Sequence, residues 1–114
     1  MTAWNHAARV VFCASVLVGI LFSLFLVPPN PHGGGTQVLH VLGYAGLTVL
    51  GLLGWPRRPR ETILAIILLG MVLECLQGFH PARAFEWQDM GANLVGIASA
   101  TAAFWIARLK SRIE

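Results

Sequence analysis

The sequence predicts an all-α fold, an integral membrane bundle of four transmembrane helices with both termini cytoplasmic. Hydrophobic residues make up 56% of the 114 residues and charged residues only 11%, whereas soluble domains average about 25% charged residues. The apolar residues fall into four runs of about 18 residues each, close to the length with which an α-helix crosses the hydrocarbon core of a bilayer. Composition and run length therefore exclude an ordinary soluble domain.

Prolines separate the four apolar runs, which cover residues 10–27, 38–55, 62–79 and 90–107. The first run ends at Pro28 and Pro29, Pro56 and Pro59 lie between the second and third, and Pro81 lies between the third and fourth. Proline lacks a backbone N–H and so ends or kinks a helix. The connections are too short to fold on their own, and no internal repeat is visible. We expect a single domain over residues 1–114.

The positive charges predict the orientation of the bundle. If all four runs cross the membrane, seven of the eight Lys and Arg residues lie on one side of it, and Arg83 lies on the other side. By the positive-inside rule, the side that carries the rest is cytoplasmic. We therefore expect a multi-pass protein of the cell inner (cytoplasmic) membrane. The net charge of +3 is then a topology signal, and it gives no reason to expect nucleic acid as a partner.

Glu74 is the only formal charge within residues 62–79. A carboxylate facing lipid costs about 2.5 kcal/mol or more, so charged residues in membrane helices usually face the bundle interior and mark functional sites. Other polar residues occur at the same predicted depth in the outer half of the membrane, at helical spacings that select one face of each helix. They are His40 with Tyr44, Gln77 with Glu74, and Asp89 with Asn93. The sequence predicts that these faces meet in a polar pocket open to the outer side.

The order and spacing of these polar residues resemble the VanZ-like family of membrane proteins over residues 36–97. The resemblance is carried by three motifs: Gln37-Val-Leu-His40-x-x-x-Tyr44-x-x-Leu47, Glu74-x-x-Gln77, and Arg83-Ala-Phe-Glu-Trp-Gln-Asp89-x-x-x-Asn93-x-x-Gly96. The family often has a lysine where this chain has Gln37, and a serine where it has Ala84. The resemblance implies a cell-envelope setting, because the family takes its name from a member associated with reduced susceptibility to the glycopeptide teicoplanin. It implies no particular reaction.

One hypothesis for the polar residues is recognition of a membrane lipid or a lipid-linked envelope precursor. Arg83 is the expected anion contact, because a guanidinium group matches phosphate and carboxylate geometry. Asp89 or Glu86 would orient it. Tyr44, Gln77 and Asn93 are the other expected ligand-binding residues.

A second hypothesis is chemistry on such a lipid, with His40, Glu74 and Asp89 as catalytic residues. His40 would act as a general base near neutral pH and Glu74 as a proton donor. The sequence has no serine elbow, no phosphate-binding glycine loop and no regular metal-ligand motif. We therefore predict no metal site from the pattern and name no cofactor, although these three residues have the donor atoms to hold a cation if the fold brings them together.

Two further interpretations stay open, and neither needs a ligand. The polar side chains can hydrogen-bond across helices and stabilise the bundle, at about 0.6 kcal/mol per contact. The chain can also be a small structural or accessory subunit of a membrane complex, with the polar cluster at an interface with a membrane protein partner. The sequence alone leaves the choice between enzyme, binding protein and structural subunit open.

Overall fold

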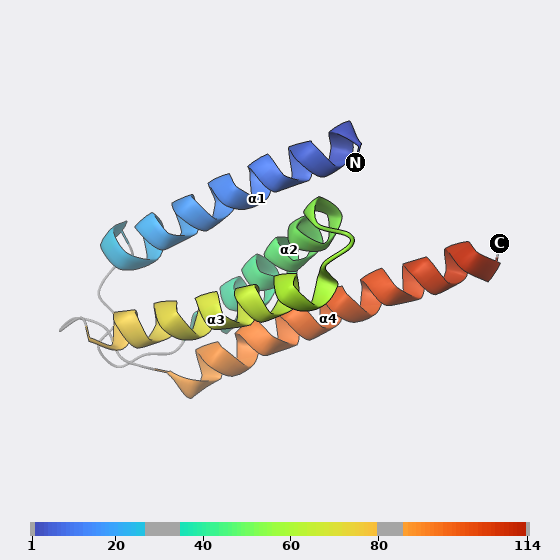
Figure 1. Ribbon diagram of the computed structural model, residues 1–114. Coiled ribbons are helices and arrows are strands. Elements are labelled where there is room, and N and C mark those ends of the chain that lie inside the picture. The colour runs from blue at the N-terminus through green and yellow to red at the C-terminus, as the bar shows by residue number, and fades with distance from the viewer. Residues whose placement is uncertain (1, 27–34, 80–85, 114) are drawn as a thin grey trace.

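The structure, a computed structural model, describes residues 2–26, 35–79 and 86–113. These residues form four long α-helices and one short π-helical turn: α1 (Ala3–Leu21), η1 (Phe22–Leu26), α2 (Gln37–Gly54), α3 (Pro59–Gly78) and α4 (Trp87–Ile113). The helices run alternately up and down a bundle, with the two chain ends at the same end of it (Figure 1). The prediction of an all-α bundle is confirmed.

Two helices extend well beyond the apolar runs of the sequence. α1 begins at Ala3 because Thr2 and Asn5 form a capping box, in which the Asn5 N–H donates to Thr2 Oγ1 at 3.2 Å and the Thr2 N–H donates to Asn5 Oδ1 at 2.9 Å. α4 continues to Ile113, and its last turn carries Lys110 and Arg112, which complement the negative end of the helix dipole. Hydropathy therefore identified the apolar part of each helix and missed its polar ends.

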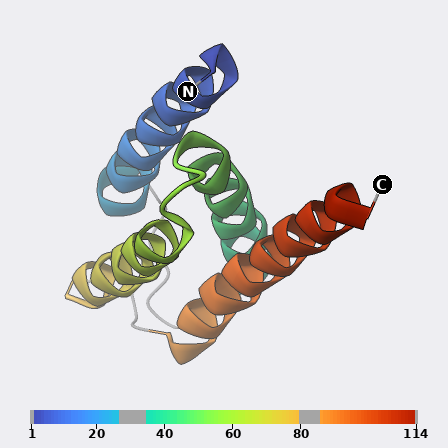
Figure 2. The ribbon, with the colours of Figure 1, turned by 45° about the vertical axis from the view of Figure 1, so that its right-hand side comes forward.

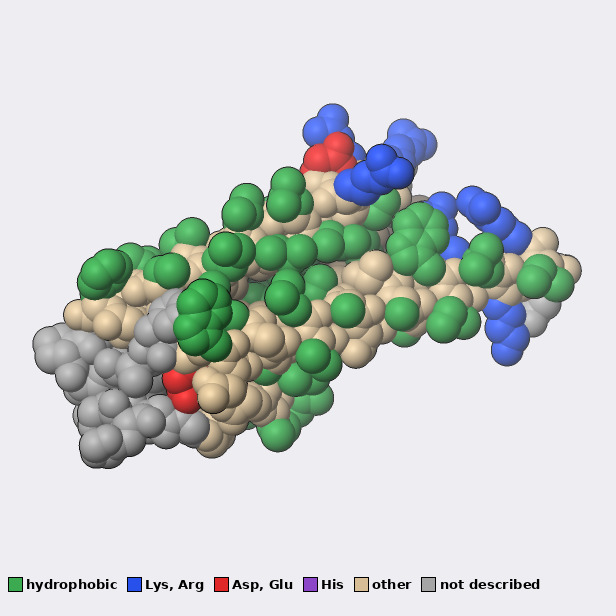
Figure 3. Space-filling model, turned by 90° about the horizontal axis from the view of Figure 1, so that it is seen from below, with side chains coloured by type: hydrophobic (Ala, Val, Ile, Leu, Met, Phe, Trp, Pro, Cys, Tyr) green, Lys and Arg blue, Asp and Glu red, His purple; other side chains and the backbone are tan. Residues whose placement is uncertain are grey.

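The outer surface of the bundle is largely apolar. Each of the four helices is long and apolar enough to cross a membrane. Large hydrophobic side chains on all four helices are exposed, among them Val10, Leu42, Leu64 and Ile106, and green apolar side chains cover much of the face seen in Figure 3. A soluble monomer rarely exposes so much contiguous apolar surface. The four helices and their apolar outer surface therefore indicate a multi-pass membrane protein.

α2 is the central helix and packs against α1, α3 and α4, as Figure 2 also shows. Its approach to α4 depends on Gly96, where an added Cβ would lie against Val41 O and within 3.1 Å of Ala45 N. The buried apolar core between the helices centres on Tyr44, Ile66 and Ile97. A small residue on α4 thus allows direct backbone contact with α2, which is how membrane helices commonly pack.

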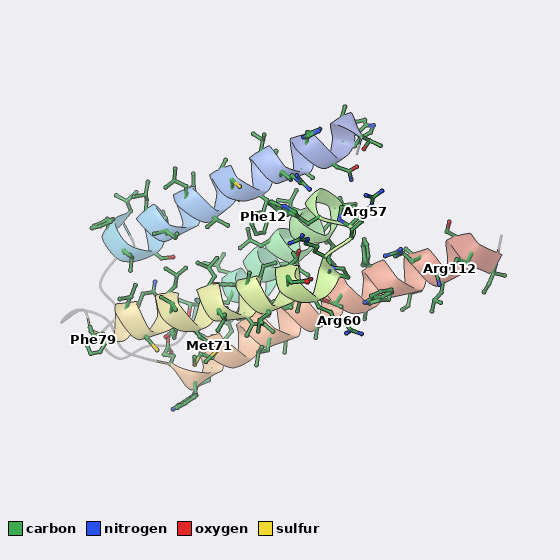
Figure 4. All side chains as sticks on the ribbon, in the orientation of Figure 1. Phe12, Arg57, Arg60, Met71, Phe79 and Arg112 are labelled. Atoms are coloured by element: carbon green, nitrogen blue, oxygen red, sulfur yellow. The ribbon has the colours of Figure 1, made fainter. Side chains whose placement is uncertain are left out.

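The described Lys and Arg side chains lie at one end of the bundle (Figure 3). Figure 4 labels Arg57, Arg60 and Arg112 toward this end and Phe79 at the opposite end. Here Arg9 Nε donates to Gly54 O at 2.6 Å, and the Arg9 guanidinium lies 5.0 Å from the centroid of the Trp55 ring. This contact satisfies a carbonyl at the end of α2, where no helical donor is available.

Candidate functional site

A buried polar cluster lies at the end of the bundle opposite the basic end. His40 belongs to the first turns of α2, Glu74 to the last turns of α3, and Asp89 and Asn93 to the first turns of α4. Because α3 runs antiparallel to α2 and α4, the end of α3 lies level with the starts of the other two helices (Figure 1). The fold therefore brings together residues that are separated by as many as 53 positions in the sequence.

The members of this cluster are nearly inaccessible to solvent. Glu74 is 2% exposed, Asp89 1% and Asn93 4%, while the His40 side chain is 19% exposed. One ligand atom from each of His40, Glu74 and Asp89 lies within 4.8 Å of the other two. The inward-facing position that helical spacing predicted for these residues is confirmed.

The hydrogen bond between His40 and Asn93 determines which ring nitrogen carries the hydrogen when the ring is neutral. His40 Nδ1 lies 2.6 Å from Asn93 Oδ1, and an amide oxygen only accepts hydrogen bonds, so Nδ1 carries a hydrogen and donates it. In a neutral ring the other nitrogen, Nε2, then carries a lone pair. That nitrogen lies 3.4 Å from Asp89 Oδ2. Two acceptor atoms therefore face each other unless a proton or a cation lies between them.

Each carboxylate is held by one oxygen and leaves the other oxygen unbonded. The Thr36 hydroxyl donates to Asp89 Oδ1 at 2.6 Å, and the Glu86 N–H donates to Glu74 Oε1 at 2.9 Å. Within the part of the chain that the structure describes, Glu74 Oε2 and Asp89 Oδ2 are buried without a hydrogen-bond partner. Buried polar atoms without a partner are rare and call for a physical explanation.

Two of the predicted ligand-binding residues lie beside this cluster, on the wall of a cavity. Tyr44 is buried and its ring stacks on His40, with centroids 6.2 Å apart and planes 9° apart. Gln77 is also buried, but its amide donates to Ser23 O in η1 at 3.0 Å. Gln77 therefore links α3 to η1, a contact that its spacing from Glu74 did not predict.

Arg83, the predicted anion contact, lies outside the described residues, so its role stays a prediction. The orientation of the Arg83 guanidinium group by Asp89 or Glu86 also stays a prediction. The described contacts of the Asp89 side chain are with Thr36 and His40.

A cavity of about 810 Å³ lies between α1, α2 and α3. The polar side chains of Thr36, His40 and Gln77 line it at the end of the bundle where the buried cluster lies. Farther along, its walls are mostly apolar and include Leu47 and Leu50 of α2. From Thr36 to Leu50 the helix rises roughly 20 Å. The cavity is therefore long, apolar over most of its length, and polar near one end.

Two glycines of α2 lie where this cavity leaves room for a side chain. Gly43 and Gly46 line it, and a Cβ added at either would meet no atom within 4 Å. Gly51 of the same helix serves close packing instead, because an added Cβ there would lie 2.6 Å from Thr62 Cγ2. Sequence reasoning did not find the cavity, because one of its walls comes from Ser15, Gly19 and Phe22 of α1 and η1, which carry no polar motif.

Sequence reasoning also missed Thr36 and the Glu86 backbone as partners of the two acids. Thr36 follows Gly35, whose φ of 78° is a left-handed conformation that glycine adopts readily. This turn leads into α2 beside the start of α4. The signal in the sequence was a glycine and a threonine just before a helix, which is too common to assign a contact.

These features define a class of protein: a multi-pass membrane bundle with a buried acid and histidine cluster beside an elongated apolar cavity. The chain matches no family model, no curated protein and no solved structure.

Proposed function

We propose that this protein is a VanZ-like protein of the inner membrane that recognises an amphipathic lipid, such as a phospholipid or a polyprenyl-linked envelope precursor. The tail of the lipid lies in the cavity between α1, α2 and α3, and its polar head lies beside Thr36, His40 and Gln77. The cavity carries this proposal, because it is long, apolar over most of its length and polar near one end. Ligand cavities combine mostly apolar walls with a few polar groups that fix orientation.

The volume of the cavity is that of a ligand-binding site, and its length and apolar walls favour a lipid chain over a small polar solute. Ligand pockets for drug-sized molecules have volumes of about 300–1,000 Å³, and this cavity has about 810 Å³. An apolar tail would gain from burial among the leucines of the walls and would need no hydrogen bonds there. The hydroxyls, amides or phosphate of a head group would find donors and acceptors at the polar end.

The experiment is native mass spectrometry of the protein extracted gently from its own membrane. Gly46→Leu would fill the cavity, because its side chain enters space that no described atom occupies within 4 Å of the added Cβ. Gly91→Leu is the matched control, since a Cβ at Gly91 also meets nothing within 4 Å but that residue of α4 is not part of the cavity wall. We expect a lipid adduct on the parent protein and on Gly91→Leu, and its loss from Gly46→Leu.

The mass of the adduct would distinguish a phospholipid from a polyprenyl-linked precursor. Helical content measured by circular dichroism must be equal in all three proteins. Equal retention of the lipid by Gly46→Leu would contradict the cavity as the tail site. Loss of the lipid from Arg83→Ala with intact folding would support the predicted anion contact at the head group.

Modification of the bound lipid, rather than recognition alone, is favoured by one observation. His40 lines the cavity, and when its ring is neutral and Nε2 holds no cation, the lone pair on Nε2 can accept a proton. A product assay on candidate lipids with the parent protein and His40→Ala tests this role. Turnover that persists unchanged in His40→Ala would remove His40 from the chemistry.

A further inference from the structure

Three side chains of the buried cluster, those of His40, Glu74 and Asp89, each make a hydrogen bond through one polar atom. That hydrogen bond fixes the orientation of the second polar atom of the same side chain. Asn93 accepts from His40 Nδ1, Thr36 donates to Asp89 Oδ1, and the Glu86 N–H donates to Glu74 Oε1. The atoms left over are His40 Nε2, Asp89 Oδ2 and Glu74 Oε2. Metal-ligating histidines nearly always donate their second ring N–H in this way, and metal-ligating carboxylates are likewise held by hydrogen bonds.

The charges of the cluster point to a cation. Two ionised carboxylates buried side by side repel each other and lose their hydration, unless a positive charge lies between them. No described Lys or Arg forms an ion pair with Glu74 or Asp89; the one described ion pair of Asp89 is with His40. A divalent cation would balance the two carboxylates with His40 neutral. It would also supply a partner to both unbonded oxygens and to the lone pair on Nε2.

We propose that His40, Glu74 and Asp89 bind one divalent cation, of the class that accepts both nitrogen and oxygen ligands, such as Zn²⁺ or Mn²⁺. Imidazole ligands suit Zn²⁺ and other transition metals, and carboxylates suit Mn²⁺, whereas Mg²⁺ and Ca²⁺ prefer oxygen ligands alone. This proposal goes beyond lipid recognition and does not depend on it.

The spacing of the donor atoms is close to that of a bound site. One ligand atom from each of the three residues lies within 4.8 Å of the other two, and two ligands of one tetrahedral Zn²⁺ ion lie about 3.4 Å apart. The most widely separated pair would therefore have to approach by roughly 1.4 Å to complete the coordination. Three protein ligands leave at least one position open, which is typical of catalytic rather than structural sites. His40 is the member of the cluster that also lines the cavity.

Metal uptake by the detergent-purified full chain, produced without a polyhistidine tag, tests this site. The protein is incubated with Zn²⁺, transferred to metal-free buffer, and its metal content is measured by inductively coupled plasma mass spectrometry. We expect about one Zn²⁺ per chain in the parent and its loss from Glu74→Gln and Asp89→Asn. Asn93→Ala, which removes the acceptor of the His40 N–H, should weaken Zn²⁺ binding by about 10–100-fold.

Two control variants separate this site from adventitious binding. Glu61→Gln removes an exposed acid from the first turn of the same helix as Glu74, and His6→Ala removes an exposed histidine; both should bind Zn²⁺ as the parent does. Zn²⁺ should also raise the thermal unfolding midpoint of the parent but not of Glu74→Gln, because a ligand of the native state stabilises it.

Glu74→Gln and Asp89→Asn are chosen so that a loss of Zn²⁺ binding can be distinguished from a loss of folding. Gln and Asn keep the size of the acids they replace, and circular dichroism of each variant without metal should match the parent. A folded parent that takes up no more Zn²⁺ or Mn²⁺ than the double variant Glu74→Gln, Asp89→Asn would overturn the proposal. A proton shared by the two acids would then be the explanation for their unbonded oxygens.

Discussion

Thr36 stands just before α2, yet its hydroxyl donates to Asp89 Oδ1 at the start of α4 and makes no capping hydrogen bond with its own helix. Asp89 is 1% exposed, so water cannot replace that donor. Glu74 depends in the same way on one backbone N–H, from Glu86. At this scale the site consists of two buried acids, each held by a single hydrogen bond that no helical periodicity predicts.

Thr36→Val should therefore destabilise the protein. Valine keeps the shape of threonine but leaves Asp89 Oδ1 buried without its donor, which costs about 1–3 kcal/mol. Thr101→Val is the matched control, because the Thr101 hydroxyl donates to Ile97 O within its own helix, and that carbonyl keeps its helical hydrogen bond. Thermal unfolding in detergent, followed by circular dichroism, measures both. Equal loss of stability in the two variants would mean that the contact with Asp89 contributes little.

At the scale of helices, the register of α2 against α4 sets the geometry of the site. Gly96 lies against the backbone of Val41 and Ala45. One turn earlier along the two helices Asn93 meets His40, and two turns earlier Asp89 meets Thr36. On the other side, an added Cβ at Gly70 of α3 would lie 2.9 Å from Asn93 Nδ2 and 3.1 Å from Tyr44 Cε1. Small residues on α3 and α4 thus hold both helices close to the polar face of α2.

Gly96→Ala should force α2 and α4 apart. The added methyl group meets backbone, which cannot rotate away, and overpacking of this kind costs about 1–3 kcal/mol. Gly91→Ala serves as the control, since its Cβ meets no atom within 4 Å and alanine favours a helix over glycine. We expect a lower unfolding midpoint for Gly96→Ala alone. A midpoint equal to that of the parent would show that the two helices part without cost.

For the whole molecule, the distribution of charge and polarity is the main feature. The described Lys and Arg residues lie at the end where α1 begins and α4 ends, and the buried cluster lies near the opposite end. If the positive-inside rule holds, the basic end is cytoplasmic and the polar end of the cavity faces outward. A lipid-linked envelope component would then reach the site from the outer side.

Cysteine labelling measures this orientation. In a chain with Cys13→Ala and Cys75→Ala, the substitutions Gln88→Cys and Ser111→Cys each place one thiol at an exposed position at opposite ends of α4. A membrane-impermeant maleimide added to intact cells should label Gln88→Cys, and it should label Ser111→Cys only after permeabilisation. The reverse pattern would place the site on the cytoplasmic side.

The class of fold and most of the inward-facing residues could be predicted from the amino-acid sequence. Apolar runs long enough to cross a bilayer leave few alternatives to helices, because backbone polar groups in lipid must bond within their own segment. The same logic identified Glu74, since a lone carboxylate in an apolar helix must avoid lipid. Helical spacing then added His40, Asp89 and Asn93, because residues three and four apart share a face.

The contacts that these residues make depend on how the helices pack in three dimensions. The tertiary structure brought a ligand atom from each of His40, Glu74 and Asp89 within 4.8 Å of the other two, and it turned the Gln77 amide toward Ser23. It also opened a cavity whose walls come from helices distant in the sequence. Periodicity reports which side of a helix faces inward, whereas hydrogen-bond partners and cavities depend on the rotation and separation of neighbouring helices, which are set by contacts such as Gly96 against Val41.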